Sequence, residues 1–360
     1  MGKKLKIGVI GLGSEQRGMG QRHVDGFRAH PQASVVALCD TNEEQLHRHA
    51  AHFAIDRVYT DAADMFEHED LDAVSIATPN AFHAPLAIAA LQHGLHVFCE
   101  KPMSITVSES EAMLAAARAS GKNLMIDFIY RFSPMSYALK SQVDAGIIGD
   151  IYFGRTVWHR RRRFPGFGGW FGQSALSGGG PLIDLGVHRL DLALWLMGYP
   201  EPVSVSGSTF DHLARVEAAK HQKPFDVEDL ACGMVKFANG ATLIVEASWA
   251  TYTHNSEEDH METKLYGTKG GLLQANVGGV KEFIAEIYTA EGDQLFTKRL
   301  DKTMVDVPSP YIEFINSILE SREPMATAEQ GVKVMKILEG IYRSAETGQE
   351  IRYEQTPALG

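Results

Sequence analysis

The sequence predicts an α/β protein with two domains: a doubly wound parallel sheet, then an α+β domain with a large, mostly antiparallel open sheet. Its 360 residues exceed the usual size of one domain. In the first third, short apolar strands alternate with helical stretches, which is typical of a parallel sheet buried on both faces. After about residue 126, strands joined by tight turns predominate, so we expect domains at 1–126 and 127–360.

The first domain shows apolar strands and helices with recognisable ends. We expect strands at 5–10, 34–39, 72–77, 95–99 and 122–127, and helices at 42–53, 81–93 and 106–120. The helices carry apolar residues at i, i+3 and i+4, the spacing of one helix face. Thr106 and Glu109 form a capping box, and Gly121 is a stop signal.

The second domain contains fewer helices and more turns. We expect a strand at 151–158, a helix at 181–197 and a series of strands from 203 to 298. Asn239-Gly240 lies between two apolar runs and predicts a hairpin, because both central residues of such a turn need positive φ. Two helices close the chain; a capping box at Thr327 and Gln330 begins the last, and Gly348 follows its end.

The composition is that of a globular protein with negative net charge. Hydrophobic residues make up 44% and charged residues 22%, which excludes a disordered chain. A net charge of -11 argues against nucleic acid or an anionic membrane as partner. The three cysteines form no C-x-x-C pair, so we expect no disulfide scaffold, no metal site and a cytoplasmic location. No signal peptide is recognisable, and no apolar run reaches the ~18 residues of a membrane span.

A glycine pair follows the first strand. Gly11 and Gly13 let the backbone approach a pyrophosphate, which the next helix N-terminus would stabilise. The usual third glycine is replaced by Gln16. We interpret the residues from Ser14 onward as an insertion of roughly four residues, with Gly20 in the third role. This position predicts dinucleotide binding.

Asp40 ends the second strand. A carboxylate there can accept both ribose hydroxyls of adenosine and repels a 2′-phosphate, which favours NAD over NADP. The alternative is a helix N-cap, a role to which aspartate is well suited. Lys101 lies between Glu100 and Pro102 at the carboxyl end of strand 95–99, where open α/β sheets bind ligands. By itself, this lysine is also consistent with an ordinary surface position.

The expected helix 181–197 is apolar nearly all round and should be buried. Asp184, His188 and Asp191 fall within about 60° of one another on an ideal helix. Such groups are costly to bury unless they pair or face a wet cavity. They form either an internal polar network or a catalytic stripe. The glycines at 178–180 favour a site, because glycine allows close approach of a ligand.

Together these motifs resemble the glucose–fructose oxidoreductase and inositol dehydrogenase family (Gfo/Idh/MocA), from about residue 5 to about residue 350. The motifs are Gly11-x-Gly13, Thr78-Pro79-Asn80-x-x-His83, Glu100-Lys101-Pro102, Tyr130-Arg131-Phe132, Gly179-Gly180-x-x-x-Asp184-x-Gly186-x-His188-x-x-Asp191 and the closing segment 344–348. The lengthened glycine loop departs from the family pattern. The resemblance implies a Rossmann domain and NAD(P)-dependent hydride transfer at a carbinol carbon of a sugar or cyclitol.

The resemblance also implies residue roles. His188 would be the general base, Lys101 would stabilise the developing alkoxide, and Asp184 would position substrate and lysine. On the cofactor side we place Gly11, Gly13, Ser14, Gly20, Asp40, Thr78, Asn80, His83, Glu100 and Lys101. On the substrate side we place Lys101, Tyr130, Arg131, Trp158, Arg160, Asp184, His188 and Asp191. Helix capping remains an alternative for His83, and salt-bridged packing for Tyr130 and Arg131.

A basic run at 158–163 precedes a glycine- and aromatic-rich stretch at 164–170. Strand alternation places Trp158 and Arg160 on one face and His159 and Arg161 on the other. Arginine forks suit carboxylates and phosphates, so an anionic sugar substrate is a hypothesis. The alternative is a solvated or oligomer-facing basic edge.

Three functions are compatible with these motifs. The leading one is an NAD-dependent sugar or cyclitol dehydrogenase. A second is a glycoside-cleaving enzyme that oxidises its substrate transiently and eliminates. A non-catalytic NAD-binding sensor would be expected to lack Lys101, Asp184 or His188, which are all present. The antiparallel sheet should leave one face free, and a homodimer or homotetramer through that face is a family-level expectation.

Overall fold

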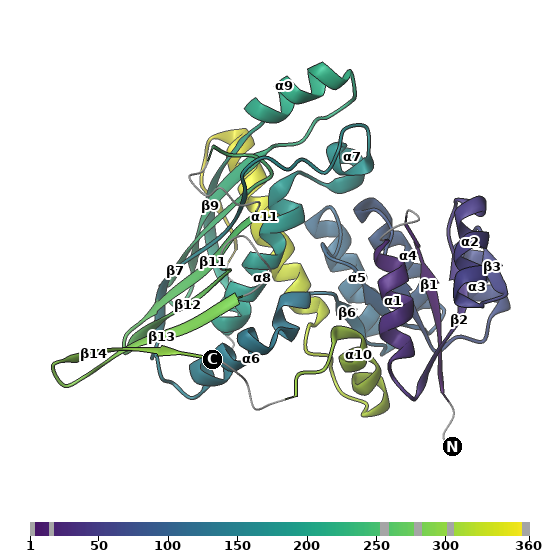
Figure 1. Ribbon diagram of the computed structural model, residues 1–360, viewed down its shortest axis with the longest axis horizontal. Helices are drawn as coiled ribbons and strands as arrows, with labels where there is room; N and C mark the ends of the chain where they lie inside the picture. The colour runs from purple at the N-terminus through teal and green to yellow at the C-terminus, as the bar shows by residue number, and fades with distance from the viewer. Residues whose placement is uncertain (1–3, 14–17, 253–258, 277–282, 301–305, 355–360) are drawn as a thin grey trace. The chain divides into compact units, whose positions relative to one another are not determined.

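The computed structural model describes residues 4–13, 18–252, 259–276, 283–300 and 306–354. The chain forms two compact units, Met1–Phe128 with Pro308–Met335, and Ile129–Val307 with Lys336–Gly360 (Figure 1). Each unit has its own sheet, one parallel and one mostly antiparallel, so the expected fold class is confirmed. Residues 308–335 belong to the first unit, which corrects the expected assignment of all of 127–360 to the second domain.

The sheet of the first unit is parallel throughout, in the strand order β3-β2-β1-β4-β5-β6. Its strands are β1 Leu5–Ile10, β2 Ala33–Cys39, β3 Arg57–Tyr59, β4 Ala73–Ile76, β5 His96–Cys99 and β6 Leu124–Ile126. Ile10 is in register with Ile76, Ile76 with Cys99, and Cys99 with Ile126. The residues that follow these strands therefore lie along one edge of the sheet. The short strand β3 was missing from the sequence prediction.

The first unit contains six helices among the described residues, and the one expected at 106–120 begins and ends at its predicted signals. They are α1 Met19–Arg28, α2 Glu43–Phe53, α3 Ala62–His68, α4 His83–Gln92, α5 Val107–Ser120 and α10 Pro310–Leu319, with a 3₁₀ turn η1 at Asn80–Phe82. The hydroxyl of Thr106 accepts a hydrogen bond from the Glu109 backbone N–H at 3.2 Å. Gly121 takes φ 66° after α5, in agreement with the predicted stop.

Helix α10 belongs to the first unit because its aromatic side chains complete that unit's core. The Tyr311 ring lies 5.3 Å from the Phe27 ring, and the Phe314 ring lies 5.5 Å from the Phe98 ring. All four side chains are buried. These contacts join residues more than 200 positions apart, which a local sequence pattern cannot reveal.

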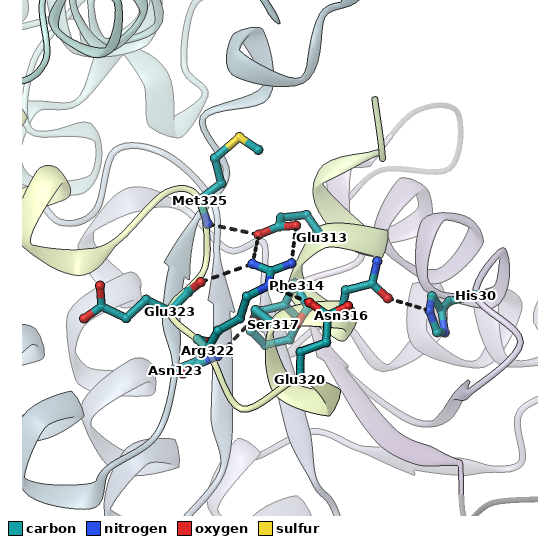
Figure 2. Close-up of polar contacts among 10 residues, drawn as sticks. All are labelled: His30, Asn123, Glu313, Phe314, Asn316, Ser317, Glu320, Arg322, Glu323 and Met325. Atoms are coloured by element: carbon teal, nitrogen blue, oxygen red, sulfur yellow. Dashed lines mark hydrogen bonds and ion pairs between the residues drawn. The ribbon is translucent and has the colours of Figure 1, made fainter. Parts of the chain in front are cut away.

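A polar network fixes the chain that follows α10 (Figure 2). The guanidinium of Arg322 binds both carboxylate oxygens of Glu313, at 2.6 and 2.9 Å. The amide of Asn123 donates to the Arg322 carbonyl at 3.0 Å, and His30 contacts the Asn316 side chain at 3.1 Å. The buried Glu313 carboxylate thus fixes Arg322 within the returning segment, and the Asn123 hydrogen bond joins that segment to the residues before β6.

The sheet of the second unit has the order β14-β13-β12-β11-β7-β10-β9-β8-β15, with β7 and β10 as its parallel pair. Its strands are β7 Ile151–Arg160, β8 Pro202–Phe210, β9 Leu230–Phe237, β10 Thr242–Ser248, β11 Asp259–Gly267, β12 Gly270–Asn276, β13 Phe283–Glu291, β14 Gln294–Arg299 and β15 Ile351–Arg352. Gly240 takes φ 83° between β9 and β10, so the predicted hairpin is confirmed.

Helices α6 and α8 pack on one face of this sheet (Figure 1). The helical segments are η2 Ile129–Phe132, α6 Pro134–Asp144, η3 Trp170–Gly172, α7 Ser174–Ser177, η4 Leu182–Gly186, α8 Val187–Leu196, α9 His212–His221 and α11 Ala328–Thr347, which begins in the first unit. Tyr152 and Tyr266 are exposed and line one groove between strands and turns. Within the described residues, every helix is too short or too polar to cross a membrane.

Candidate active site

The glycine loop after β1 leaves no room for side chains. Gly11 and Gly13 have φ 83° and 72°, a region that favours glycine. A Cβ on Gly11 would lie 2.8 Å from the Thr78 nitrogen, and one on Gly20 would lie 2.0 Å from the Gly11 carbonyl oxygen. Helix α1 therefore packs directly on the loop through Gly20, the position expected of a third glycine. Ser14 lies outside the described residues.

Asp40 joins this loop to the end of β2. One carboxylate oxygen accepts from the Leu12 backbone N–H at 2.7 Å, and the other from the Asn42 backbone N–H at 2.9 Å. The N-cap of α2 is Asn42, whose side chain accepts from the Gln45 N–H at 3.0 Å. The helix-cap alternative for Asp40 is therefore wrong. Each oxygen keeps a further lone pair that suits a ribose hydroxyl.

His83 connects the turns after β4 and β5. Its Nδ1 lies 2.7 Å from the Pro102 carbonyl and its Nε2 lies 3.0 Å from the Thr78 carbonyl. The side chain is wholly buried, and burial lowers the pKa of His83 although both carbonyls favour the charged form. Both ring nitrogens thus contact backbone carbonyls, so His83 joins the two turns, and its cofactor-binding assignment stays a prediction. Asn80, at the start of η1, is also buried.

Glu100 and Lys101 follow β5 beside an unexpected histidine. Glu100 is buried, receives the Lys101 backbone N–H at 3.1 Å and contacts His23 Nε2 at 3.0 Å. Burial would raise the pKa of Glu100, but the hydrogen bond and charge of His23 and the charge of Lys101 outweigh burial and lower it. Burial and the nearby Glu100 raise the pKa of Asp127 well above its usual range. Neither His23 nor Asp127 was predicted from the sequence to belong to the site.

The helix expected at 181–197 is interrupted by a π turn. The π-helical segment η4, Leu182–Gly186, carries Asp184, and His188 lies at the start of α8. A π turn contains more residues than an α turn and often marks a functional site. The 100° spacing assumed for an ideal helix therefore fails between Asp184 and His188.

Aromatic side chains define the surroundings of Asp184 and His188. The indole N–H of Trp249, a buried residue of the sequence that follows β10, donates to Asp184 Oδ2 at 2.9 Å. The His188 ring lies 5.3 Å from Tyr130 and 5.8 Å from Trp158. Burial raises the pKa of Tyr130 to about 12, so its hydroxyl stays protonated. The sequence did not predict this contact, because no local pattern around Trp249 indicates that its side chain bonds to Asp184, 65 residues away.

The glycines before this helix serve the protein rather than a ligand. A Cβ on Gly179 would lie 2.1 Å from the Tyr342 hydroxyl, and one on Gly180 would lie 2.1 Å from the Glu228 carbonyl. The buried Glu228 carboxylate accepts from the N–H groups of Gly180 and Leu182 at 2.8 and 3.1 Å. This corrects the expectation that the glycines admit a ligand: they admit the carboxylate that caps the helix.

Arg131 and Asp191 form an interior ion pair. Arg131 Nε and Nη2 donate to the two Asp191 oxygens at 2.9 and 2.5 Å, and Tyr199 bonds to both residues. Arg131 and Asp191 have no exposed surface. Because their polar groups are engaged with each other, the geometry favours salt-bridged packing, the alternative left open for Arg131, and the substrate-binding assignment of both residues stays a prediction.

Trp158 and Arg160 extend from one face of β7, as strand alternation predicts. Both donate to Asp259 Oδ1, from Trp158 Nε1 at 3.1 Å and from Arg160 Nε at 2.9 Å. His159 lies instead toward Glu246, at 3.4 Å. Lys101 belongs to the first unit and His188 to the second, so their expected convergence stays a prediction.

Two stretches of the chain match one enzyme family. Residues 5–128 match the oxidoreductase family with an NAD-binding Rossmann fold, and residues 137–273 match the GFO/IDH/MocA C-terminal domain. The chain is 31% identical over 356 residues to the D-glucoside 3-dehydrogenase of Escherichia coli K12, covering 96% of this chain and 97% of that protein. It is 27% identical over 371 residues to the D-apiose dehydrogenase of Paraburkholderia graminis, covering 99% and 92%.

Solved structures share the fold over nearly the whole chain. A levoglucosan dehydrogenase in complex with NADH has a TM-score of 0.84 at 25% identity, covering 98% of this chain and 100% of that one. An aldose–aldose oxidoreductase of Caulobacter crescentus, complexed with glycerol, has a TM-score of 0.80 at 25% identity, covering 98% and 100%. The chain belongs to the Gfo/Idh/MocA family of oxidoreductases, whose first domain is an NAD-binding Rossmann fold.

Proposed function

We propose that this protein is an NAD-dependent dehydrogenase that acts on a secondary alcohol of a sugar or cyclitol. The observation that carries the proposal is the place of the His188 imidazole. It lies in α8, directly after the η4 segment that holds Asp184, and the rings of Tyr130 and Trp158 flank it. Aromatic faces suit the C–H surfaces of sugars, and a histidine titrates near neutral pH. The named activities of the relatives, on D-glucosides, D-apiose and levoglucosan, support the same class.

The cofactor side fits NAD. Gly11 and Gly13 have positive φ in the loop after β1, where a pyrophosphate binds in folds of this kind, and the Asp40 carboxylate is held at the end of β2 by two backbone N–H groups. A fixed carboxylate there disfavours the 2′-phosphate of NADP, so we propose NAD as the preferred cofactor. When bound, NAD supplies the hydride acceptor.

The chain's own residues supply the acid–base chemistry. His188 takes the proton of the substrate hydroxyl, whose intrinsic pKa lies far above 7. The Lys101 ammonium binds the same oxygen and stabilises its developing negative charge. Asp184, oriented by the Trp249 indole, binds the substrate and positions the lysine. This division of roles rests on the family resemblance and on the local geometry of each unit.

A substrate panel tests the proposal. Aldoses, cyclitols, uronates and glycosides are incubated with NAD and the enzyme, and the absorbance of NADH is followed. We expect NADH to accumulate with at least one polyol. Glycoside cleavage without net NADH would contradict the dehydrogenase and favour transient oxidation and elimination. The same panel with NADP should give much weaker saturation.

The free sheet face supports a proposal about assembly. Tyr152, Tyr266 and Leu295 are exposed and line one groove, together with Tyr288 and Phe296. Exposed apolar patches of this kind mark interaction sites. We therefore propose a homodimer or homotetramer through this face, which light scattering of the purified protein would test. A cytoplasmic location is proposed from the three free cysteines.

A further inference from the structure

Three arginines of the basic run, Arg160, Arg162 and Arg163, lie near acidic side chains. Arg160 pairs with Asp259 at 2.9 Å, and Arg163 lies 3.9 Å from the same carboxylate. Arg162 pairs with Glu217 and also donates to the Tyr252 hydroxyl at 2.9 Å. The positive charge of the run is therefore partly offset within the second unit, most directly at Arg160.

Asp259 is the central acid of this arrangement. The residue is only 8% exposed, and its Oδ1 accepts from both Arg160 Nε and Trp158 Nε1. Its backbone is fixed as well, because the Asn276 amide donates to the Asp259 carbonyl at 2.9 Å. A buried carboxylate that accepts from charged and neutral donors is held in place.

The ion pair of Arg160 and Asp259 lies close to His188, the candidate general base. The Arg160 guanidinium is 5.6 Å from the centre of the Trp158 ring, and that ring is 5.8 Å from His188. Trp158 thus contacts both the His188 ring and the Arg160–Asp259 pair. A sugar that binds with a carbinol at His188 extends toward this pair.

The charges of Arg160 and Asp259 offset each other. A substrate carboxylate that approaches Arg160 also approaches Asp259, so repulsion by the Asp259 carboxylate offsets the attraction that the guanidinium alone would exert. Hydroxyl groups, in contrast, can donate to Asp259 and accept from Arg160 at the same time.

We propose that Asp259 is a specificity-determining residue that neutralises Arg160 and makes the site select uncharged sugars or cyclitols over sugar acids and sugar phosphates. This inference rests on the proposed function and answers the question that the basic run raises. Without the Asp259 charge, the same arginine fork would favour an anionic substrate. Asp259, at the start of β11, then determines whether Arg160 of β7 favours an anionic or an uncharged substrate.

The test compares Asp259→Asn with the wild type. The asparagine keeps a carbonyl acceptor for Trp158 and Arg160 but removes the charge. The kcat/KM is measured for the best neutral substrate of the panel and for its uronate, and the uronate is also assayed as a competitive inhibitor. We expect the kcat/KM for the uronate, divided by that for the neutral substrate, to rise by at least about tenfold in the variant. If the uronate is only an inhibitor, its affinity relative to that of the neutral substrate should rise by the same factor. The rise should shrink at high salt.

Glu217→Gln is the matched control, because it removes the acidic partner of Arg162 and adds the same net charge. The ratio should stay unchanged in this variant. If Asp259→Asn does not fold, Arg160→Gln provides the test with the opposite sign, a lower ratio.

An unchanged ratio in Asp259→Asn, or a wild type that already prefers the uronate, would overturn the inference. Absence of NAD-linked activity with every polyol would instead overturn the proposed function.

Discussion

The two units hold their parts of the candidate site by different kinds of contact. In the first unit, two of the predicted cofactor-side residues bind backbone groups: Asp40 accepts from Leu12 and Asn42, and His83 contacts two carbonyls, whereas Glu100 also contacts the His23 side chain. In the second unit, the residues around Asp184 and Trp158 bind side chains: Trp249 donates to Asp184, and Asp259 accepts from Trp158 and Arg160, whereas Glu228 binds backbone N–H groups. Backbone-based contacts suit a site for one constant ligand. Side-chain contacts can be altered by single substitutions, which suits a site whose ligand differs between relatives.

The largest effect is expected for His188→Ala. Loss of the general base should lower kcat by roughly 10²–10⁴-fold. Because His188 lies in the second unit, NAD affinity measured by titration should be unchanged. Turnover close to that of the wild type would contradict the role of His188 as general base. A parallel loss of NAD binding would contradict the assignment of cofactor binding to the first unit.

Asp191→Asn should act on stability rather than on substrate choice. It leaves the buried Arg131 without a charged partner, and breaking such a pair costs about 3–5 kcal/mol. Urea-induced unfolding measures this loss. The matched control replaces both residues, Arg131→Met with Asp191→Leu, and should recover much of the stability. An unaltered unfolding midpoint in Asp191→Asn would contradict the packing role.

Asp40→Ala should weaken NAD binding. Removing a charged acceptor costs about 1.5–3 kcal/mol, which corresponds to roughly 10–100-fold in dissociation constant. NADP binding should weaken less, because the repulsion of its 2′-phosphate is also removed. Titration with both cofactors measures the difference, with Asn42→Ser as a control that keeps a helix cap. A wild type that binds NADP as tightly as NAD would refute the assignment.

Trp249→Phe should lower kcat/KM by about tenfold, the effect of one lost hydrogen bond to a charged group. The ring is largely retained, so the protein should unfold at nearly the same temperature. The matched control is Trp195→Phe, at the far end of α8, which should leave kcat/KM unchanged. Equal activity of the two variants would show that the Asp184 contact is not needed.

The smallest effect concerns Asp127, whose pKa is raised by burial and by Glu100. Above its unfolded pKa of about 3.9, the unfolded chain releases a proton that the folded protein keeps, so stability falls as pH rises. Asp127→Asn removes this dependence. Its melting temperature should exceed that of the wild type by a few degrees at pH 8, with the gain shrinking toward pH 4. A gain that grows on acidification would contradict this account.

Sequence patterns predicted the features that depend on local chain geometry. The strand ends at Asp40 and Glu100, the glycines at 11 and 13, and the alternation of Trp158 and His159 all follow from periods of the backbone. The motif residues of the family could be assigned for the same reason, because they stand at fixed offsets from these strands.

Partners distant in sequence could not be predicted. Gly180 was expected to admit a ligand, yet it admits Glu228, which is 48 residues away. For Asp191 the sequence left open an internal polar network or a catalytic stripe, and the residue pairs with Arg131, 60 residues away. The π turn at Asp184 also changes the helix angle on which the stripe depended. In each case, the identity of the partner is decided by tertiary packing rather than by local spacing.

A crystal structure of the enzyme with NAD and a bound polyol would test the central claim most directly. The account predicts that Lys101 Nζ and His188 Nε2 both lie within hydrogen-bond reach, about 2.6–3.2 Å, of the oxygen on the carbon that faces the nicotinamide. If either group binds a different part of the substrate or points away from that carbon, the proposed division of catalytic roles is wrong.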